Sequence, residues 1–222
     1  MKALPRPKLL FFDVGETLAS EERIWSEWAD WLAVPRGVFF AALGAVIEAR
    51  HHHEDVFGVV KPGLDLAAER EARIRAGHSP GLRPADLYPD VAETLAWARQ
   101  SGFRLGFAGN NPVRTEEFLR SIAFEGDIVG SSGGWGVAKP DPRFFQRIVD
   151  LSGLLPEEVV YVGDRIDNDV LPALRLGLRS VFVERGPWGV VQGRWPEAAE
   201  VPWRVRALSE LPGLMRRVFS LP

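Results

Sequence analysis

Short apolar runs alternate with longer amphipathic stretches along most of this chain. The first run, Leu9-Leu10-Phe11-Phe12, ends at a carboxylate, Asp13. Continuous apolar runs are typical of strands buried on both faces of a parallel sheet. The pattern predicts strands at residues 8–13, 103–108, 127–129, 159–162 and 180–183, and helices at residues 91–100, 112–123, 142–151 and 169–176. Strands alternating with helices in this way favour an α/β fold with a doubly wound parallel sheet and helices on both faces.

The stretch between the first two predicted strands contains only helical patterns. Ser20, followed by two glutamates, favours a helix start. Further helices are predicted from Pro35 and over about residues 64–76, before Gly77. We therefore expect residues 19–87 to form an inserted α-helical cap, and residues 1–18 and 88–222 to form the core domain. After Gly186 the pattern becomes helical again only at residues 208–219.

Polar clusters follow several of the predicted strands. They are Asp13 with Thr17, Gly109-Asn110-Asn111, Lys139-Pro140-Asp141-Pro142, and Gly163-Asp164 with Asn168-Asp169. Because the carboxyl ends of parallel strands meet at one edge of a sheet, these clusters should converge there. Three carboxylates beside one lysine suit an oxygen-ligated Mg²⁺ and a phosphate group. A carboxylate nucleophile can form an aspartyl-phosphate there, while the metal and the lysine screen the charge on the phosphoryl oxygens.

Composition narrows these possibilities. The chain has 222 residues, enough for one sizeable domain or a domain with an insertion. It has no cysteine, which excludes disulfides, thiolate metal sites and cysteine nucleophiles. The net charge of −3 argues against a nucleic-acid partner, and no segment has the apolar length of a membrane span. Two prolines within residues 1–7 are not typical of a secretory signal, so we expect a cytoplasmic protein without a membrane partner.

The four polar clusters, in this order, resemble the motifs of the haloacid dehalogenase superfamily. The resemblance covers about residues 8–185 and is closest to the phosphatases that carry a helical cap after the first strand. It implies that Asp13 is the nucleophile and also a metal ligand, together with the main-chain carbonyl of Gly15. It further implies that Asp164 ligates Mg²⁺ and that Asp169 is a ligand or a support for one. The implied substrate is a small phosphorylated metabolite.

The resemblance also implies the phosphate-binding residues. Lys139 would hold the phosphoryl group and pair with Asp13, and Gly109 and Asn110 would contact the phosphoryl oxygens. Lysine is scarce in this chain, where Lys2, Lys8 and Lys61 are the only others, and this makes Lys139 more notable.

The chain departs from the family pattern at two positions. The family's phosphatases carry a second aspartate, the general acid and base, where this chain has Gly15, and its absence typically costs about 10²–10⁴-fold in rate. They carry Ser or Thr where this chain has Gly109, which leaves main-chain N–H groups and Asn110 to bind the phosphoryl oxygens. Glu16 is a candidate replacement for the acid, although adjacent residues usually point in different directions.

Three functions remain open at this point. The first is a Mg²⁺-dependent phosphatase that is slow because the acid is missing. The second is a degenerate, non-catalytic relative that binds a phosphorylated ligand or a protein partner. The third is a 2-haloacid dehalogenase, because those relatives also lack the second aspartate, although they need no metal and their fourth motif differs from Gly163-Asp164.

Some conspicuous residues have simpler interpretations. The run His51-His52-His53 cannot direct all its rings at one ion on a helix, so we interpret it as a polar helix end. Trp25, Trp28 and Trp31 recur at helical spacing and should pack inside the cap. Arg36 and Arg114 could approach a substrate anion, but we expect them at the surface. The sequence has no signature of a particular substrate or of an oligomeric state.

Overall fold

The structure is a computed structural model that describes residues 6–78 and 81–219. It divides into two compact units, Glu21–Asp86 and a larger unit formed by Met1–Ser20 with Leu87–Pro222. Residues 1–5, on which the expectation about a secretory signal partly rests, lie outside the described residues. Each unit is described by itself.

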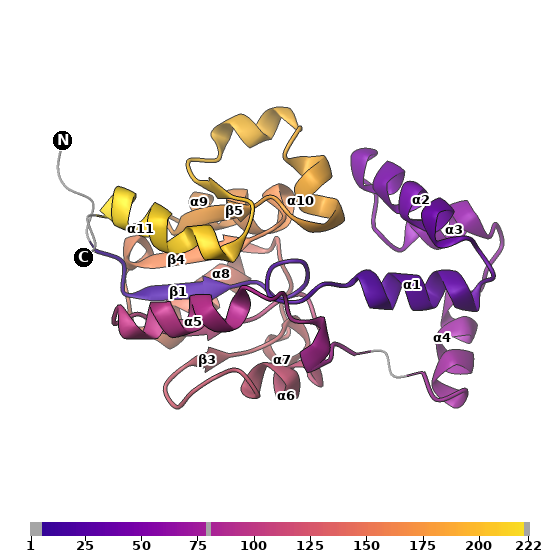
Figure 1. Cartoon of the computed structure of the whole chain (residues 1–222), viewed down its shortest axis with the longest axis horizontal. Coiled ribbons are helices and arrows are strands. Elements are labelled where there is room, and N and C mark those ends of the chain that lie inside the picture. The colour runs from indigo at the N-terminus through magenta and orange to yellow at the C-terminus, as the bar shows by residue number, and fades with distance from the viewer. Residues whose placement is uncertain (1–5, 79–80, 220–222) are drawn as a thin grey trace. The chain divides into compact units, whose positions relative to one another are not determined.

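A six-stranded parallel sheet forms the centre of the larger unit (Figure 1). Its strand order is β3-β2-β1-β4-β5-β6. The strands are β1 (Leu9–Phe12), β2 (Arg104–Phe107), β3 (Ile128–Val129), β4 (Val159–Gly163), β5 (Arg179–Val183) and β6 (Arg204–Val205). In β1, Leu10 pairs with Leu105 of β2 on one side and with Val160 of β4 on the other. All four residues of β1 are fully buried, as its apolar sequence predicts.

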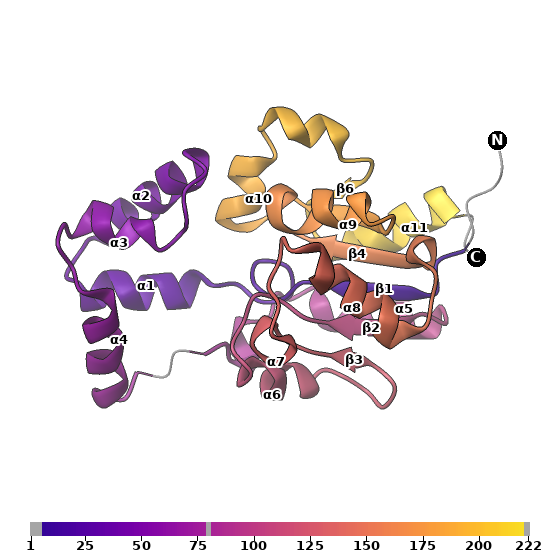
Figure 2. The ribbon, with the colours of Figure 1, turned by 180° about the vertical axis from the view of Figure 1, so that it is seen from behind.

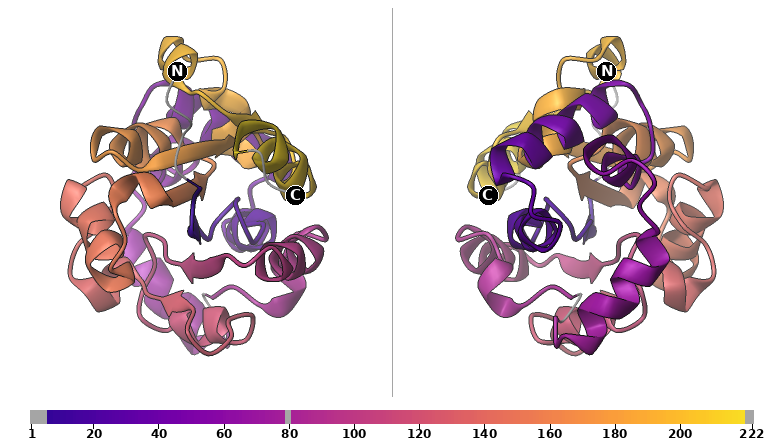
Figure 3. Two further views of the ribbon diagram at one scale, coloured as in Figure 1. Left: turned by 90° about the vertical axis from the view of Figure 1, so that its left-hand side faces the viewer. Right: turned by 90° about the vertical axis from the view of Figure 1, so that its right-hand side faces the viewer.

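Helices cover both faces of this sheet, which confirms the predicted fold class. The helices α5 (Val91–Gln100) and α11 (Leu211–Phe219) lie on one face, and α8 (Pro142–Ser152) and α9 (Leu171–Arg175) lie on the other (Figures 1 and 2). The end-on views show the sheet between these two layers (Figure 3). On α8, Phe144, Phe145 and Ile148 are fully buried and pack in one cluster with Phe11 and Tyr161 of the sheet.

Short elements complete the larger unit. They are the helices α6 (Thr115–Arg120), α7 (Ser132–Trp135) and α10 (Gly186–Gln192), a π-helical turn (Ile166–Val170), and 3₁₀ turns at Pro156–Glu158, Pro196–Glu200 and Leu208–Glu210.

Within its described residues, 21–78 and 81–86, the smaller unit contains four helices and one 3₁₀ turn, Pro84–Asp86. The helices are α1 (Glu22–Trp31), α2 (Arg36–Glu48), α3 (Asp55–Val60) and α4 (Leu66–Arg75). Trp25 and Trp28 are buried, and the ring centroids of Trp28 and Phe57 lie 4.8 Å apart, which confirms the predicted packing role of these two tryptophans. Trp31 is half-buried, and its Nε1 donates to Glu69 at 2.7 Å.

The structure differs from the sequence prediction in several elements. The helix expected at residues 112–123 is shorter, because Pro112 accepts a turn bond from the Thr115 N–H and α6 begins only there. The helix that was expected to begin at Asp169 begins at Leu171, because Asp169 lies within the π-helical turn Ile166–Val170. The helices α3 and α10 and the strand β6 were not predicted. The histidine run directly follows the end of α2: His51 and His52 are exposed, and the His51 N–H donates to the Val46 carbonyl of that helix at 3.1 Å, as expected for a polar helix end.

No single helix among the described residues is long and apolar enough to cross a membrane. Taken together, α1 and α2 have the length and apolar composition of a membrane span, but the chain bends by 117° between them.

Candidate active site

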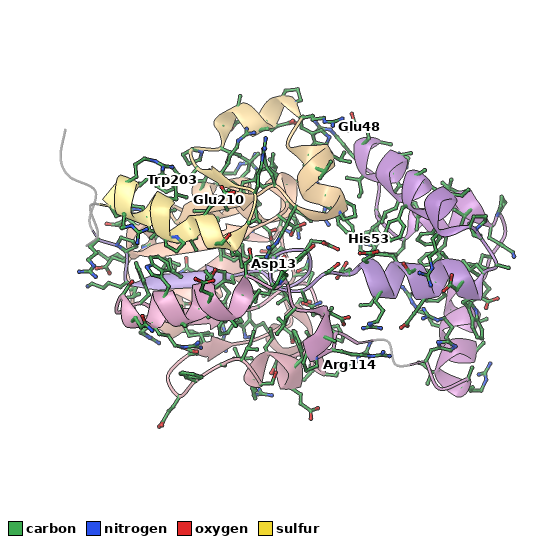
Figure 4. The ribbon with its side chains drawn as sticks, viewed as in Figure 1. Asp13, Glu48, His53, Arg114, Trp203 and Glu210 are labelled. Carbon is green, nitrogen blue, oxygen red and sulfur yellow. The ribbon has the colours of Figure 1, made fainter. Side chains whose placement is uncertain are left out.

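Asp13 lies immediately beyond the end of β1 (Figure 4). The parallel ladder extends by one residue here, because the Asp13 N–H donates to the Val162 carbonyl at 2.9 Å. This bond fixes the main chain of Asp13 at the carboxyl edge of the sheet, where open α/β sheets bind their ligands. The residue is only 6% exposed.

Lys139 is paired with two of the predicted site residues. Its Nζ lies 2.5 Å from Asp13 Oδ1 and 2.5 Å from Asp169 Oδ1, and the residue is buried. Burial alone would lower the pKa of this ammonium, but the carboxylates of Asp13 and Asp169 outweigh it and raise the pKa. Lys139 is therefore charged at neutral pH, and the pairing with Asp13 expected from the sequence is present.

The remaining two carboxylates are positioned by the segment that follows β4. Asp164 comes directly after the last residue of β4, and its Oδ1 accepts a 3.3 Å hydrogen bond from Thr17 Oγ1. Asp169 lies in the π-helical turn, and its Oδ2 accepts from the Arg165 N–H at 3.1 Å. A Cβ at position 163 would lie 2.6 Å from the Asp169 carboxyl group, so Gly163 permits this close approach.

The three carboxylates form a group that could hold a metal ion. Ligand oxygens of Asp13, Asp164 and Asp169 all lie within 4.8 Å of one another, and all three residues are buried. Burial, followed by the nearby carboxylates of Asp169 and Asp13, raises the pKa of Asp164 well above its usual range. Burial also raises the pKa of Asp169 to about 6, although Lys139 acts in the opposite direction. One ammonium cannot balance three buried carboxylates, and a set of oxygen donors fits a hard divalent cation such as Mg²⁺.

Asn110 holds the main chain of Lys139. Its Nδ2 donates to the Lys139 carbonyl at 2.8 Å, and its Oδ1 accepts from the Lys139 N–H at 2.8 Å. Both ends of the amide are therefore engaged in positioning the lysine. The contacts of Asn110 and Gly109 with a phosphoryl group stay predictions, as does the metal contact of the Gly15 carbonyl.

Two features of the site were not predicted from the sequence. Asn111 Oδ1 is buried beside Asp13, and no hydrogen bond reaches it from the part of the chain that the structure describes. Its signal was present in the sequence, since Asn111 directly follows the predicted binding residues Gly109 and Asn110. The second feature is the hydrogen bond from the Tyr88 hydroxyl to Glu16.

Glu16 is buried and paired with Tyr88. The Tyr88 hydroxyl donates to Glu16 Oε2 at 2.5 Å, and Arg185 donates to the Glu16 carbonyl at 3.2 Å. Burial and the Glu16 carboxylate raise the pKa of Tyr88, so Tyr88 is the proton donor of this pair. Glu16 also has a φ of 51°, a conformation uncommon for residues with a side chain. The Glu16 carboxylate is close enough to raise the pKa of Asp164 further.

The two candidate arginines belong to different units. In the smaller unit, Arg36 is exposed and pairs with Asp30 at 2.6 Å. In the larger unit, Arg114 lies apart from Asp13 (Figure 4).

Known proteins resemble most of this chain in sequence. The family model described as haloacid dehalogenase-like hydrolase matches residues 7–177. Phosphoserine phosphatase of Thermus thermophilus is 34% identical over 222 residues, covering 81% of this chain and 89% of that protein. Glyceraldehyde 3-phosphate phosphatase of Methanopyrus kandleri is 30% identical over 207 residues, covering 84% of this chain and 88% of that protein.

Solved structures share the fold at lower identity. A magnesium-bound putative haloacid dehalogenase-type hydrolase of Bacillus subtilis has a TM-score of 0.67 at 17% identity, covering 95% of this chain and 99% of that chain. L-2-haloacid dehalogenase of Xanthobacter autotrophicus has a TM-score of 0.64 at 22% identity, covering 95% and 98%. With the family match over most of the chain and phosphatase relatives at this identity, the protein is an enzyme of the haloacid dehalogenase-like hydrolase family, of the phosphatase type.

Proposed function

We propose that this protein hydrolyses small phosphate monoesters with the aid of Mg²⁺, through a covalent phosphoryl group on Asp13. The observation that carries the proposal is the buried cluster in which Asp13 meets Lys139, Asp164 and Asp169. Its carboxylate donors fit Mg²⁺, which when bound would screen the negative charge of the phosphoryl oxygens.

Asp13 acts as the nucleophile in this proposal. One of its carboxylate oxygens attacks phosphorus, the ester P–O bond breaks, and the leaving alkoxide takes a proton from water to become the alcohol. Water then attacks the phosphoryl group, releases inorganic phosphate and restores the carboxylate. Lys139 holds Asp13 in place and offsets charge on the phosphoryl oxygens, and Asp169 holds Lys139.

The proposed substrates are small phosphorylated metabolites. Relatives named for phosphoserine and for glyceraldehyde 3-phosphate support this class, since both compounds carry one phosphate on a three-carbon skeleton. Neither compound is singled out for this chain.

The main competing reaction is hydrolysis of a 2-haloacid. The absence of a carboxylate at Gly15 is compatible with that reaction. The two further buried carboxylates beside Asp13 favour the phosphatase, because they suit a cation that a dehalogenase does not need.

A substrate panel with and without chelator tests the proposal. We expect wild-type protein to release phosphate from p-nitrophenyl phosphate and from members of a phosphomonoester panel in the presence of Mg²⁺. Excess EDTA should abolish the reaction, and Asp13→Asn should remove it. Absence of turnover across the panel, or chloride release from 2-chloropropionate in EDTA, would contradict the proposal.

A further inference from the structure

Gly109 has no side chain that could bind a phosphoryl oxygen next to Asp13. The space that such a side chain would occupy is taken by the side chain of Asn111. A Cβ built on Gly109 would lie 2.6 Å from Asn111 Oδ1 and 2.8 Å from Asp13 Oδ1. The side chain of Asn111 therefore extends into the volume that a residue at position 109 would use, next to the nucleophile.

The main chain of Asn111 is fixed by its neighbours. Its N–H donates to the Gly109 carbonyl at 2.9 Å, and its carbonyl accepts from the Gly133 N–H at 3.1 Å and from Ser132 Oγ at 3.2 Å. In contrast, Asn111 Oδ1 is buried and accepts no hydrogen bond from the described residues. A buried polar atom without a partner in a well-held loop is unfavourable and suggests that its partner is a ligand.

Asn110 cannot fill this role in the same conformation. Both ends of its amide are bonded to the main chain of Lys139. The Asn111 amide oxygen, in contrast, has no such bond from the described residues and lies next to the same position 109 as Asp13 Oδ1.

We propose that Asn111 supplies the side-chain hydrogen bond to the phosphoryl group that Gly109 cannot supply. A half-turn of its amide exchanges Oδ1 for Nδ2, so that an N–H group donates to a phosphoryl oxygen held at Asp13. Asn111 is thus a phosphate-binding residue. The side-chain donor that the family's phosphatases carry at the position of Gly109 lies two positions later in this chain, at Asn111. The inference rests on the proposed phosphatase function.

The test compares the inhibition constant of inorganic phosphate, and the kinetics with p-nitrophenyl phosphate, among Asn111 variants. Loss of one hydrogen bond to a charged group corresponds to roughly 10- to 100-fold in affinity. We expect Asn111→Ala to raise the phosphate inhibition constant by this factor. Asn111→Asp has the same shape but presents a negative charge, so it should weaken phosphate binding further. Gln146→Ala, which truncates an exposed amide on α8, is the matched control and should leave the constant unchanged.

A double variant tests whether the two positions serve the same place. Gly109→Ser alone would clash with Asn111 and Asp13 and should lower activity. Combined with Asn111→Ala, the serine loses the clash with Asn111, and only the Asp13 carboxylate has to shift for the serine to donate to the same oxygen. We expect the double variant to bind phosphate more tightly than Asn111→Ala.

The possible outcomes are distinct. Wild-type turnover with an unchanged phosphate inhibition constant in Asn111→Ala would overturn this inference and leave the phosphatase function intact. Equal effects of Asn111→Ala and Asn111→Asp on thermal unfolding, with no effect on phosphate inhibition, would assign Asn111 a purely structural role and overturn it as well. Absence of turnover and of phosphate binding in the wild type would overturn both proposals together.

Discussion

Gly15 determines how fast the leaving alcohol can be protonated. It has no side chain, and the next carboxylate along the chain, Glu16, is bonded to the Tyr88 hydroxyl. We expect Gly15→Asp to raise kcat roughly 10-fold or more, toward the ~10²–10⁴-fold that a positioned general acid contributes. The gain should be larger for alkyl phosphates than for p-nitrophenyl phosphate, because a poor leaving group depends more on the acid. Steady-state kinetics on both substrates measures this.

Gly15→Asn is the control, since it has the same size and cannot donate an acidic proton. A rate loss of more than about 10²-fold in Glu16→Gln, with no gain in Gly15→Asp, would contradict this account and identify Glu16 as the acid.

Two tyrosine hydroxyls lie close to carboxylates and allow a comparison of stability. The Tyr88 hydroxyl donates to the buried carboxylate of Glu16 at 2.5 Å. In contrast, burial and the nearby Asp169 carboxylate raise the pKa of Tyr161, whose hydroxyl makes no well-formed hydrogen bond to the described residues. We expect Tyr88→Phe to lower the free energy of unfolding by about 1.5–3 kcal/mol, the range for a hydrogen bond to a charged group. Tyr161→Phe should cost less, because the contact of the Tyr161 hydroxyl with Asp169 falls short of a well-formed hydrogen bond. Urea denaturation measures both, and equal losses would contradict the role of the Glu16 pair.

For helices and strands, the prediction was accurate where the segment has its own start and end residues and its own apolar pattern. The helix expected at residues 91–100 is α5 with the same bounds, because Asp90 precedes it, Glu93 lies in its first turn and Gly102 follows it. The strand β6 has two residues and takes its register from β5, through the pairs Phe182–Arg204 and Val183–Val205. Such a strand has no apolar pattern of its own, so only the assembled sheet reveals it.

The short helix α7 connects stability to the site. Ser131 caps it by accepting from the Gly134 N–H at 3.0 Å, and donates to Glu116 Oε1 at 2.8 Å. The next residues, Ser132 and Gly133, hold the main chain of the loop that contains Asn111. We expect Ser131→Ala to cost about 1–3 kcal/mol of unfolding free energy, because it removes a cap and a donor to a largely buried carboxylate. Phosphate affinity should fall with it, since the loop loses its support.

Ser121→Ala provides the comparison for Ser131→Ala. Its hydroxyl donates to the Phe118 carbonyl from an exposed helix end, so its loss should change stability by less than about 0.5 kcal/mol. Chemical denaturation and phosphate inhibition measured on both variants would separate the effects. A Ser131→Ala variant with wild-type stability would contradict the capping argument.

For the whole molecule, the sequence predicted that the polar clusters meet at one edge of the sheet, but it did not predict most of the contacts among them. Asp13 and Asp164 each follow an apolar strand, so a parallel sheet necessarily brings them to one edge. The pairing of Asn110 with Lys139, and of Glu16 with Tyr88, joins residues 29 and 72 positions apart through loops. Loop conformation depends on the assembled fold and has no periodicity, so these contacts required the structure.

Repulsion among the three buried carboxylates, which one lysine offsets only in part, destabilises the metal-free protein. The raised pKa of Asp164 reflects that cost. In the unfolded chain an aspartate titrates near 4, so above that pH the native state binds more protons than the unfolded state. Stability conferred by the protonated form is therefore lost as the pH rises above about 4. A bound divalent cation would offset the repulsion.

Asp164→Asn should consequently stabilise the metal-free protein and remove its response to Mg²⁺. At pH 7.5 with EDTA we expect a gain of about 1–2 kcal/mol in unfolding free energy, typical of relieving strain at a functional site. The gain should vanish below about pH 3, where Asp164 is protonated in both the native and the unfolded chain. Saturating Mg²⁺, at about 100 times its dissociation constant, should stabilise the wild type by about 2.7 kcal/mol and leave the variant unchanged.

Asp167→Asn, at an exposed aspartate paired with Arg165, serves as the control and should retain the Mg²⁺ response. Differential scanning calorimetry in EDTA and in Mg²⁺ measures these differences, and an Asp164→Asn variant that loses stability in EDTA would contradict the electrostatic argument.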